Sequence, residues 1–288
     1  MNIIGAFPQR RSEIEEAQRE LAEAVDAEIT TMSIEHDEKG NRAKAFLYCL
    51  ETRCPETGWM VPMSLSWIIS KSRKAIACPK SDYANRRVEI EIDIGVSDAE
   101  LKAAERGTVQ DGDLVFELSG KTYRTPIKTL RGDYRLPDGT IGNRLRRWEK
   151  SDFVPRPDDI FQEQLYAIQW IIKESLTKSR HETFFAAPTE VDLARERKVE
   201  QLVAENLSKW QEEGLVLDMA IELGYKTDEP IHTRGWTHWH HLFTPRNIIA
   251  AVAVAKRIDK CTVISFCDLL NSNAKLCRWT TSPTVREK

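Results

Sequence analysis

The chain has 288 residues, 41% of them hydrophobic and 30% charged, and its formal net charge is −3 at pH 7. This hydrophobic content is enough to bury a sizeable core in one or two compact units, whereas the small negative charge argues against nucleic-acid binding over the whole surface. The longest apolar stretch, Ile248–Ala255, is far shorter than the roughly 20 residues of a membrane-spanning helix, and the sequence shows no signal peptide. We therefore expect a cytoplasmic protein with no membrane partner.

The first predicted element is an acidic helix over residues 12–28. Ile14, Leu21 and Val25 repeat on one helical face, and seven carboxylates occupy other positions. We assign residues 1–38 to an acidic helical flank.

Residues 39–153 are predicted to form a small β-rich unit. The runs Ala45–Leu50 and Val88–Ile94 have the composition and alternation of strands. One helix interrupts them, because Ser97 and Glu100 have the spacing of a capping box. Gly107 is expected to end this helix.

The Pro-rich segment Val154-Pro-Arg-Pro-Asp158 marks the predicted domain boundary, and residues 154–288 are assigned to a mainly helical unit. Two runs at the start of this unit, Leu165–Ile172 and Thr183–Ala187, could pair as a hairpin. The pattern also permits a helix through the first run.

Three further helices are predicted after these runs. Thr189 and Asp192 form the cap of a long amphipathic helix that Gly214 ends. A second helix opens at Thr244-Pro245, and a third spans residues 261–276. Together the elements predict an α+β fold, with a ribbon-like β unit followed by a mainly helical one.

The segment Cys54-Pro-Glu-Thr-Gly58 has the outline of a zinc knuckle, Cys-Pro-x-Cys-Gly. Thr57 stands in place of the second cysteine, and the expected second knuckle, Glu117-Leu-Ser-Gly120, contains no cysteine. Because a structural zinc site needs four strong ligands, we expect a degenerate ribbon whose metal has been replaced by core packing.

Positive charge is concentrated between Lys121 and Lys150, where nine basic residues face three acidic ones. Tyr123, Tyr134 and Trp148 are interleaved with them. Basic and aromatic side chains together suit phosphate contact and stacking on unpaired bases. The alternative is a solvated face that offsets the acidic N-terminal helix.

The segment Arg234-Gly-Trp-Thr-His-Trp-His-His241 places two tryptophans and three histidines just before the helix that begins at Pro245. Its histidines could bind a metal or move protons near neutral pH, and the helix amides could hold an anion. Because adjacent side chains point in different directions, the alternative is a packed Trp/His elbow with one or two functional polar contacts. No Gly-rich phosphate loop, His-Glu-x-x-His motif or nucleophile elbow occurs, so no catalytic residue is assigned.

Six segments carry a resemblance to a known family. They are Glu51-Thr-Arg-Cys-Pro-Glu-Thr-Gly-Trp59, Leu130-Arg-Gly-Asp133, Phe153-Val-Pro-Arg-Pro-Asp-Asp-Ile-Phe-Gln162, Ala187-Pro-Thr-Glu-Val-Asp-Leu-Ala194, Gly235-Trp-Thr-His-Trp-His-His-Leu-Phe-Thr-Pro-Arg246 and Asn273-Ala-Lys-Leu-Cys-Arg-Trp279. Together they resemble adenine-specific DNA methylases that carry an inserted zinc ribbon and are often associated with phage-defence gene clusters.

In that family an Asp-Pro-Phe-x-Gly loop builds the S-adenosylmethionine pocket and an Asp-Pro-Pro-Tyr motif is catalytic. Neither motif occurs in this sequence. The resemblance therefore implies the central part of a larger α/β methyltransferase, either a fragment or the product of a split gene. Such a part would be inactive alone, would bind no cofactor itself, and would need a catalytic half or adjoining subunit as partner.

The resemblance also implies DNA as a partner and S-adenosylmethionine as the cofactor of the complete enzyme, with the target base flipped out of the helix. The residues expected to contact DNA phosphates are Arg131, Arg144, Arg146, Arg147 and Arg246. The residues expected to line the joint to the catalytic half are Trp236, Trp239 and His240.

Two other classes of function stay open at the level of sequence. The acidic helix and the Trp/His segment could form a non-catalytic protein-interaction module. A metal-dependent hydrolase built on His238, His240 and His241 is the other alternative, which tight zinc or manganese binding would support.

Overall fold

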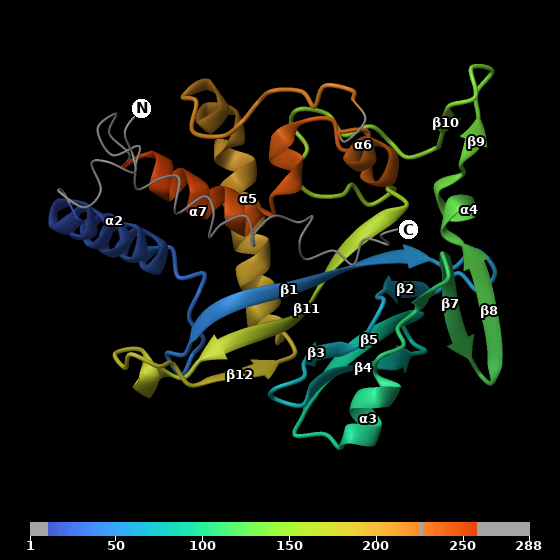
Figure 1. Ribbon diagram of the computed structural model, residues 1–288, viewed down its shortest axis with the longest axis horizontal. Helices are drawn as coiled ribbons and strands as arrows, with labels where there is room; N and C mark the ends of the chain where they lie inside the picture. The colour runs from blue at the N-terminus through green and yellow to red at the C-terminus, as the bar shows by residue number, and fades with distance from the viewer. Residues whose placement is uncertain (1–10, 225–226, 258–288) are drawn as a thin grey trace.

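The computed structural model describes residues 11–224 and 227–257 and shows the α+β fold that the sequence predicts (Figure 1). Within this part of the chain, the main sheet has the strand order β12-β11-β1-β2-β5-β4-β3. Its neighbouring strands are antiparallel except for β2 and β5, which pair in parallel. The strands are β1 (Arg42–Arg53), β2 (Met60–Met63), β3 (Ile68–Ser70), β4 (Ala75–Asp82), β5 (Arg87–Ile94), β11 (Phe161–Ile171) and β12 (Thr183–Ala186).

The longest strand pairing joins β1 to β11, from Arg42 opposite Ile171 to Thr52 opposite Phe161. The predicted domain boundary at residue 153 therefore falls within one continuous sheet. The hairpin interpretation of the next segment is confirmed, because β11 pairs with β12 in antiparallel register. The alternative helix is wrong: both faces of β11 pack against other parts of the molecule, so a continuous apolar run forms a strand here.

A second, three-stranded sheet consists of β6 (Val109–Gln110), β7 (Asp113–Leu118) and β8 (Lys121–Pro126). It packs against the turn between β1 and β2 through a shared apolar core that includes Trp59 and Phe116. The rings of these two residues lie 5.8 Å apart. The β-rich unit is thus held together by aromatic packing.

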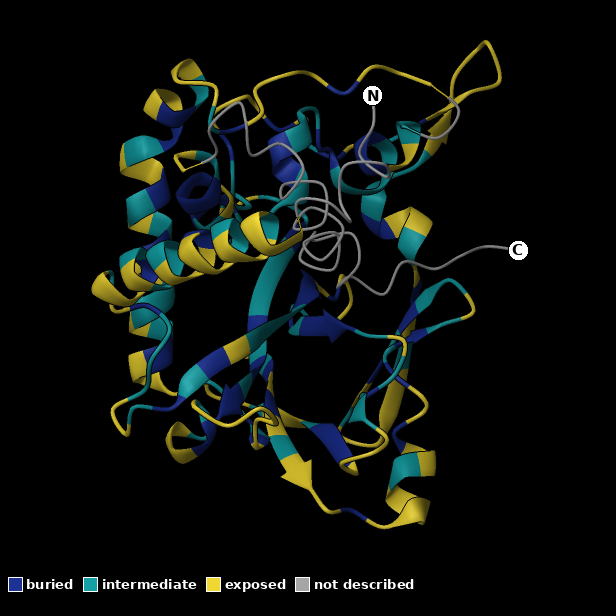
Figure 2. Ribbon diagram, turned by 60° about the vertical axis from the view of Figure 1, so that its left-hand side comes forward, coloured by how far each residue is buried: buried dark blue, intermediate teal, exposed yellow. Residues whose placement is uncertain are grey.

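Three helices form a layer over one end of the main sheet: α2 (Arg11–Thr31), α5 (Glu190–Glu212) and α7 (Pro245–Ala255) (Figure 1). They share a core with Val199, Val203 and the apolar face of α7. Figure 2 shows that the outer face of α2 is exposed, as its acidic composition predicts. The remaining helices are α3 (Asp98–Ala103), α4 (Ile127–Arg131), α6 (Asp228–Arg234), and the short 3₁₀ turns η1 (Lys173–Ser175) and η2 (Trp239–Leu242).

The predicted helix starts are confirmed by their caps. Ser97 and Thr189 each form a capping box with the third helical residue. The Thr244 side chain accepts the amide of Asn247 at the start of α7, with proline at the first position. Gly214, with a φ of 70°, ends the turn after α5. The predicted helix over residues 261–276 lies outside the described residues.

Gly107 does not end α3, which stops at Ala103. Its amide donates to the carbonyl of Leu65 at 2.9 Å. A Cβ atom at residue 107 would lie 2.0 Å from the carbonyl oxygen of Ser64, so the backbones approach too closely for any side chain. Glycine is therefore required here by backbone packing.

No helix of the described residues combines the length and apolar character needed to cross a bilayer.

Candidate nucleic-acid interface

A projecting arm carries the basic cluster that the sequence singles out. We call residues 121–147 the basic arm; it comprises β8, α4, β9 (Tyr134–Arg135) and β10 (Ile141–Gly142). These elements stand along one side of the molecule, and the β9–β10 hairpin extends beyond its body (Figure 1). Every residue from Tyr134 to Ile141 in this hairpin is exposed, whereas Leu130 and Leu145 anchor the rest of the arm in the core.

A glycine turn and short-range hydrogen bonds determine the shape of the arm. Gly132 adopts a φ of 65° and ends α4 in the left-handed region. At the hairpin tip, the amide of Leu136 donates to the carbonyl of Thr140 at 2.8 Å. The Asp138 carboxylate accepts the hydroxyl and the amide of Thr140, at 2.6 and 2.9 Å. These hydrogen bonds lower the pKa of Asp138, so the tip carries a negative charge at neutral pH.

Six cations on the arm are exposed. Arg124 pairs with Asp113, Lys121 lies over the Tyr123 ring, and Arg147 donates to the carbonyl of Ile231. The other three are Lys128, Arg135 and Arg144. None of them forms an ion pair with a described residue. Arg144 is placed by its backbone amide, which donates to the carbonyl of Arg131 at 2.9 Å, and by its methylene groups, which pass over Gly132. These cations are free to contact a polyanion.

The five arginines predicted to contact DNA lie in different environments. Arg144 is exposed, as described above. Arg147 is also exposed, but its guanidinium donates to the carbonyl of Ile231, and partial burial lowers the pKa of this group. Arg131 pairs with Asp133 at 2.8 Å. The structure therefore leaves Arg144 available, holds Arg147 against α6, and neutralises Arg131.

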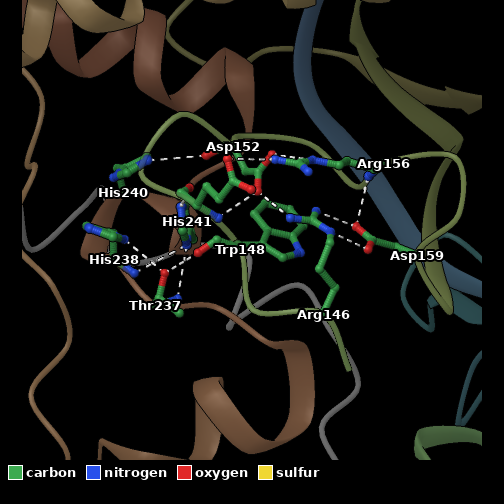
Figure 3. Close-up of polar contacts among 10 residues, drawn as sticks. Arg146, Trp148, Asp152, Arg156, Asp159, Thr237, His238, His240 and His241 are labelled. Carbon is green, nitrogen blue, oxygen red and sulfur yellow. Dashed lines mark hydrogen bonds and ion pairs between the residues drawn. The ribbon is translucent and has the colours of Figure 1, made fainter. Parts of the chain in front are cut away.

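Arg146 is the centre of an arginine–aspartate network (Figure 3). Its Nε and Nη2 atoms each donate to Asp159 at 2.7 Å, and its Nη1 atom donates to Asp152. Asp152 also accepts from the Nε atom of Arg156, at 3.0 Å, and from the amide of Glu149, at 2.7 Å. Because two carboxylates compensate its charge, Arg146 has a structural role in this position.

Arg246 is buried between the helices and the sheet, with 9% of its surface exposed. Its Nε atom donates to Glu196 at 2.7 Å and its Nη1 atom to the carbonyl of Ile34 at 2.9 Å. Its guanidinium carbon lies 3.7 Å from the centre of the Phe46 ring, and the Tyr48 hydroxyl donates to the same glutamate at 2.6 Å. This position is out of reach of a phosphate on the surface.

The three histidines of the Trp/His segment come together (Figure 3). Their ring centres are 4.3 Å apart for His240 and His241, 5.4 Å for His238 and His241, and 5.7 Å for His238 and His240. The Nε2 atom of His241 lies 3.0 Å from the carbonyl of Glu149, and that of His240 lies 3.2 Å from the carbonyl of Asp152. The rings therefore anchor the irregular segment that carries Arg146.

The hydrogen bonds of His241 define its tautomer. Its Nδ1 atom accepts the amides of Thr237 and His238, at 3.1 and 3.2 Å, so the proton resides on Nε2. The Nδ1 atom of His240 is buried without a hydrogen bond, and burial lowers the pKa of this residue to about 4. His240 is therefore neutral at pH 7, and both rings hold the segment around Glu149 and Asp152 through its carbonyls. Within residues 11–224 and 227–257, no group of three or more His, Cys, Asp or Glu side chains could hold a metal ion.

Two tryptophans complete this region, which we call the Trp/His cluster: Trp148, Trp236, His238, His240 and His241. The ring of Trp148 lies 6.1 Å from Trp236 and 5.2 Å from His241. Trp236 and His240 are only 2% and 1% exposed, so neither presents its side chain to another molecule in this structure. Of the three residues predicted to line a joint, Trp239 alone is partly exposed.

The knuckle-like segment keeps its turn. The amide of Gly58 donates to the carbonyl of Cys54 at 2.8 Å, and the amide of Cys54 donates to Trp59 at the same distance. Gly58 has a φ of 72°, in the left-handed region that glycine adopts without strain. Cys54 is a free thiol, 1% exposed, within the core of the β-rich unit.

Sequence reasoning missed Lys128 and Arg135, which are exposed on the same arm as Arg144. No local signal distinguishes them: Asp133 lies two residues from both Arg131 and Arg135, and only the structure shows that it pairs with Arg131. No family model, curated protein or solved structure matches this chain. The functional argument therefore rests on its residues and their geometry.

Proposed function

We propose that this chain is the central, DNA-contacting part of an adenine-N6-specific DNA methyltransferase. The observation that carries the proposal is the basic arm, on which Lys128, Arg135 and Arg144 are exposed and form no ion pair with a carboxylate of the described residues. Cations of this kind release counterions from DNA when they contact phosphates, and this release favours binding. Tyr134, 51% exposed on the same arm, adds an aromatic surface for bases.

The assignment to methyltransferases rests on the six segments described above. In the proposed enzyme, a partner supplies the S-adenosylmethionine pocket and the Asp-Pro-Pro-Tyr motif, and this chain holds the DNA. The segment 144–148 supports this arrangement, because Arg144 is exposed while its neighbours are fixed. Arg146 is held by the arginine–aspartate network and Trp148 by the Trp/His cluster. The proposed DNA contact at Arg144 would therefore be attached to a segment that tertiary contacts hold in place.

DNA binding tests the first part of the proposal. The variant K128A/R135A/R144A removes three charges from the arm, and K39A/K102A/R106A removes three exposed charges elsewhere. Each lost phosphate contact reduces the slope of log K against log salt by about 0.9. Fluorescence anisotropy between 50 and 200 mM salt should show a slope reduced by about 2.7 for the arm variant, with little change for the control. Equal slopes for wild type and arm variant would contradict the proposal.

Methylation tests the second part. Plasmid DNA is incubated with labelled S-adenosylmethionine and either this chain alone or this chain with the products of adjoining reading frames. We expect labelling only when a neighbouring product is present. Labelling by the chain alone would refute the division of work, and failure to label with any neighbour would refute the methyltransferase assignment.

A protein-interaction role is the second candidate, favoured by one observation. Leu217, Met219 and Leu223 are 51%, 59% and 75% exposed on the extended segment after α5. Apolar side chains gathered on one segment are typical of contact surfaces. If this role is correct, the variant L217S/M219S/L223S should lower the association state seen by analytical ultracentrifugation, with DNA affinity unchanged.

A further inference from the structure

The tip of the basic arm is a two-stranded ribbon. Arg135 lies opposite Ile141, and Tyr134 lies opposite Gly142. Neighbouring strands lie about 4.8 Å apart, and the major groove of B-DNA, about 12 Å wide, admits such a two-stranded ribbon. The dimensions of the arm therefore match a groove of duplex DNA.

Gly142 leaves room for the Tyr134 ring to lie close to the ribbon. The ring of Tyr134 lies directly against Gly142, where a Cβ atom would come within 2.8 Å of the ring carbon Cζ and 3.0 Å of the hydroxyl oxygen. Any side chain at residue 142 would push this ring away from the strands. The tyrosine instead covers its own ribbon, which reduces the thickness of the arm.

The charges of the ribbon indicate how it approaches DNA. Asp138 at the tip is ionised, so an end-on approach to phosphates is unfavourable. Arg135 lies on the ribbon face opposite to that of Tyr134, because successive residues of a strand alternate between faces, and it is exposed and without an ion pair among the described residues. A sideways approach brings this guanidinium toward the floor of the groove and keeps the tip carboxylate away from the backbone.

The other two cations lie at the base of the ribbon. Lys128 belongs to α4, whose last turn is closed by Gly132, and the Arg144 side chain crosses that same glycine. A ribbon in the groove would place this base at the edge, where phosphates lie. We propose, on the basis of the function proposed above, that the ribbon enters the major groove of double-stranded DNA, with Arg135 directed at base edges and with Lys128 and Arg144 on phosphates.

The test compares the full chain on three probes of one mixed sequence: a duplex, the single strand, and a duplex in which every purine is the 7-deaza analogue. The analogue removes the N7 acceptors of the major groove and leaves the phosphates in place. A bidentate arginine contact discriminates by roughly 1–3 kcal/mol, so we expect about tenfold weaker binding to the 7-deaza duplex. The single strand should also bind about tenfold more weakly, because it lacks a groove.

Variants separate base contact from phosphate contact. R135K keeps the positive charge and loses the guanidinium fork, so it should keep the salt slope and lose the sensitivity to 7-deaza purines. K128A/R144A should keep that sensitivity, with a salt slope reduced by about 1.8. Unfolding midpoints of both variants verify that the fold is intact.

The outcomes distinguish failure of groove entry from failure of the proposed function. Equal affinity for duplex and single strand, or 7-deaza sensitivity that persists in R135K, would overturn groove entry and leave the proposed function in place. Binding to none of the probes would overturn both, and would indicate that the exposed Tyr134, Leu136 and Ile141 contact a protein instead.

Discussion

The exposed part of the basic arm and the arginine–aspartate network, which begins at Arg146, adjoin each other in sequence, yet their arginines lie in opposite environments. Arg135 and Arg144 on the arm are exposed and unpaired among the described residues. Arg146, two residues after the second of these, is bound by Asp152 and Asp159. The comparison shows that an arginine is available to bind another molecule only where the fold places no carboxylate beside its guanidinium.

The largest effect on stability is expected at the centre of the Trp/His cluster. The variant His241→Ala removes a fully buried ring and leaves the amides of Thr237 and His238 and the carbonyl of Glu149 without partners. The cavity and the unsatisfied groups together should cost about 4 kcal/mol of unfolding free energy. Urea denaturation measures this value. A loss below about 1 kcal/mol would mean that the ring does not clamp the segment.

The arginine–aspartate network should give the next largest effect. The variant Asp152→Ala leaves Arg146 with one carboxylate and removes an acceptor from Arg156 and from the amide of Glu149. Because the Asp152 side chain is 9% exposed, we expect a loss of about 3 kcal/mol. The exposed Asp138→Ala provides a matched control from the arm. Similar urea midpoints for the two variants would remove the distinction between the regions.

The two regions should also differ in their response to pH. The fold holds His240 neutral with a pKa of about 4, below the value of about 6.5 in an unfolded chain. Protons therefore favour the unfolded state: this contribution is complete above about pH 6.5 and is lost as the pH falls toward 4. We expect a decrease of about 2 kcal/mol between pH 7 and pH 5. In His240→Gln, which retains a donor for the carbonyl of Asp152, the decrease should be smaller, and an unchanged decrease would exclude this residue as its source.

The smallest change in stability is expected on the arm itself. Arg135→Ala and Arg144→Ala remove exposed side chains that form no ion pair with described residues. Substitutions of this kind usually change the unfolding free energy by less than about 0.5 kcal/mol. Thermal unfolding of each variant checks this value. A loss above about 2 kcal/mol would show that these cations are structural, as Arg146 is.

The sequence predicted α2, α3, α5 and α7 because their signals are local, whereas it did not predict α4 or α6. The capping pairs Ser97 with Glu100 and Thr189 with Asp192 lie within one turn, so their chemistry is visible in any short window. The partner of β1 was not predictable in this way. Cys49 contacts Gln164 across 115 residues, and no local pattern specifies that pairing.

The candidate site shows the same difference between local signals and long-range contacts. The basic cluster was recognised from composition, but the availability of each charge depends on tertiary contacts. Arg146 pairs with carboxylates 6 and 13 residues away, and Arg246 pairs with Glu196 across 50 residues. The sequence left open whether the three histidine rings converge, and the 3₁₀ turn after His238 brings them together.

The pairing of β1 with β11 has a consequence for synthesis of the protein. The Thr52 hydroxyl bonds to a carbonyl 108 residues further along the chain. At 5–20 residues per second, a ribosome needs roughly 5–20 s to deliver that partner, and the growing chain meanwhile carries a long strand with an open edge. A chain that ends at residue 153 would lack β11, so the edge of β1 would stay unpaired and favour aggregation. The sheet therefore sets a minimum length of chain that can fold as a unit.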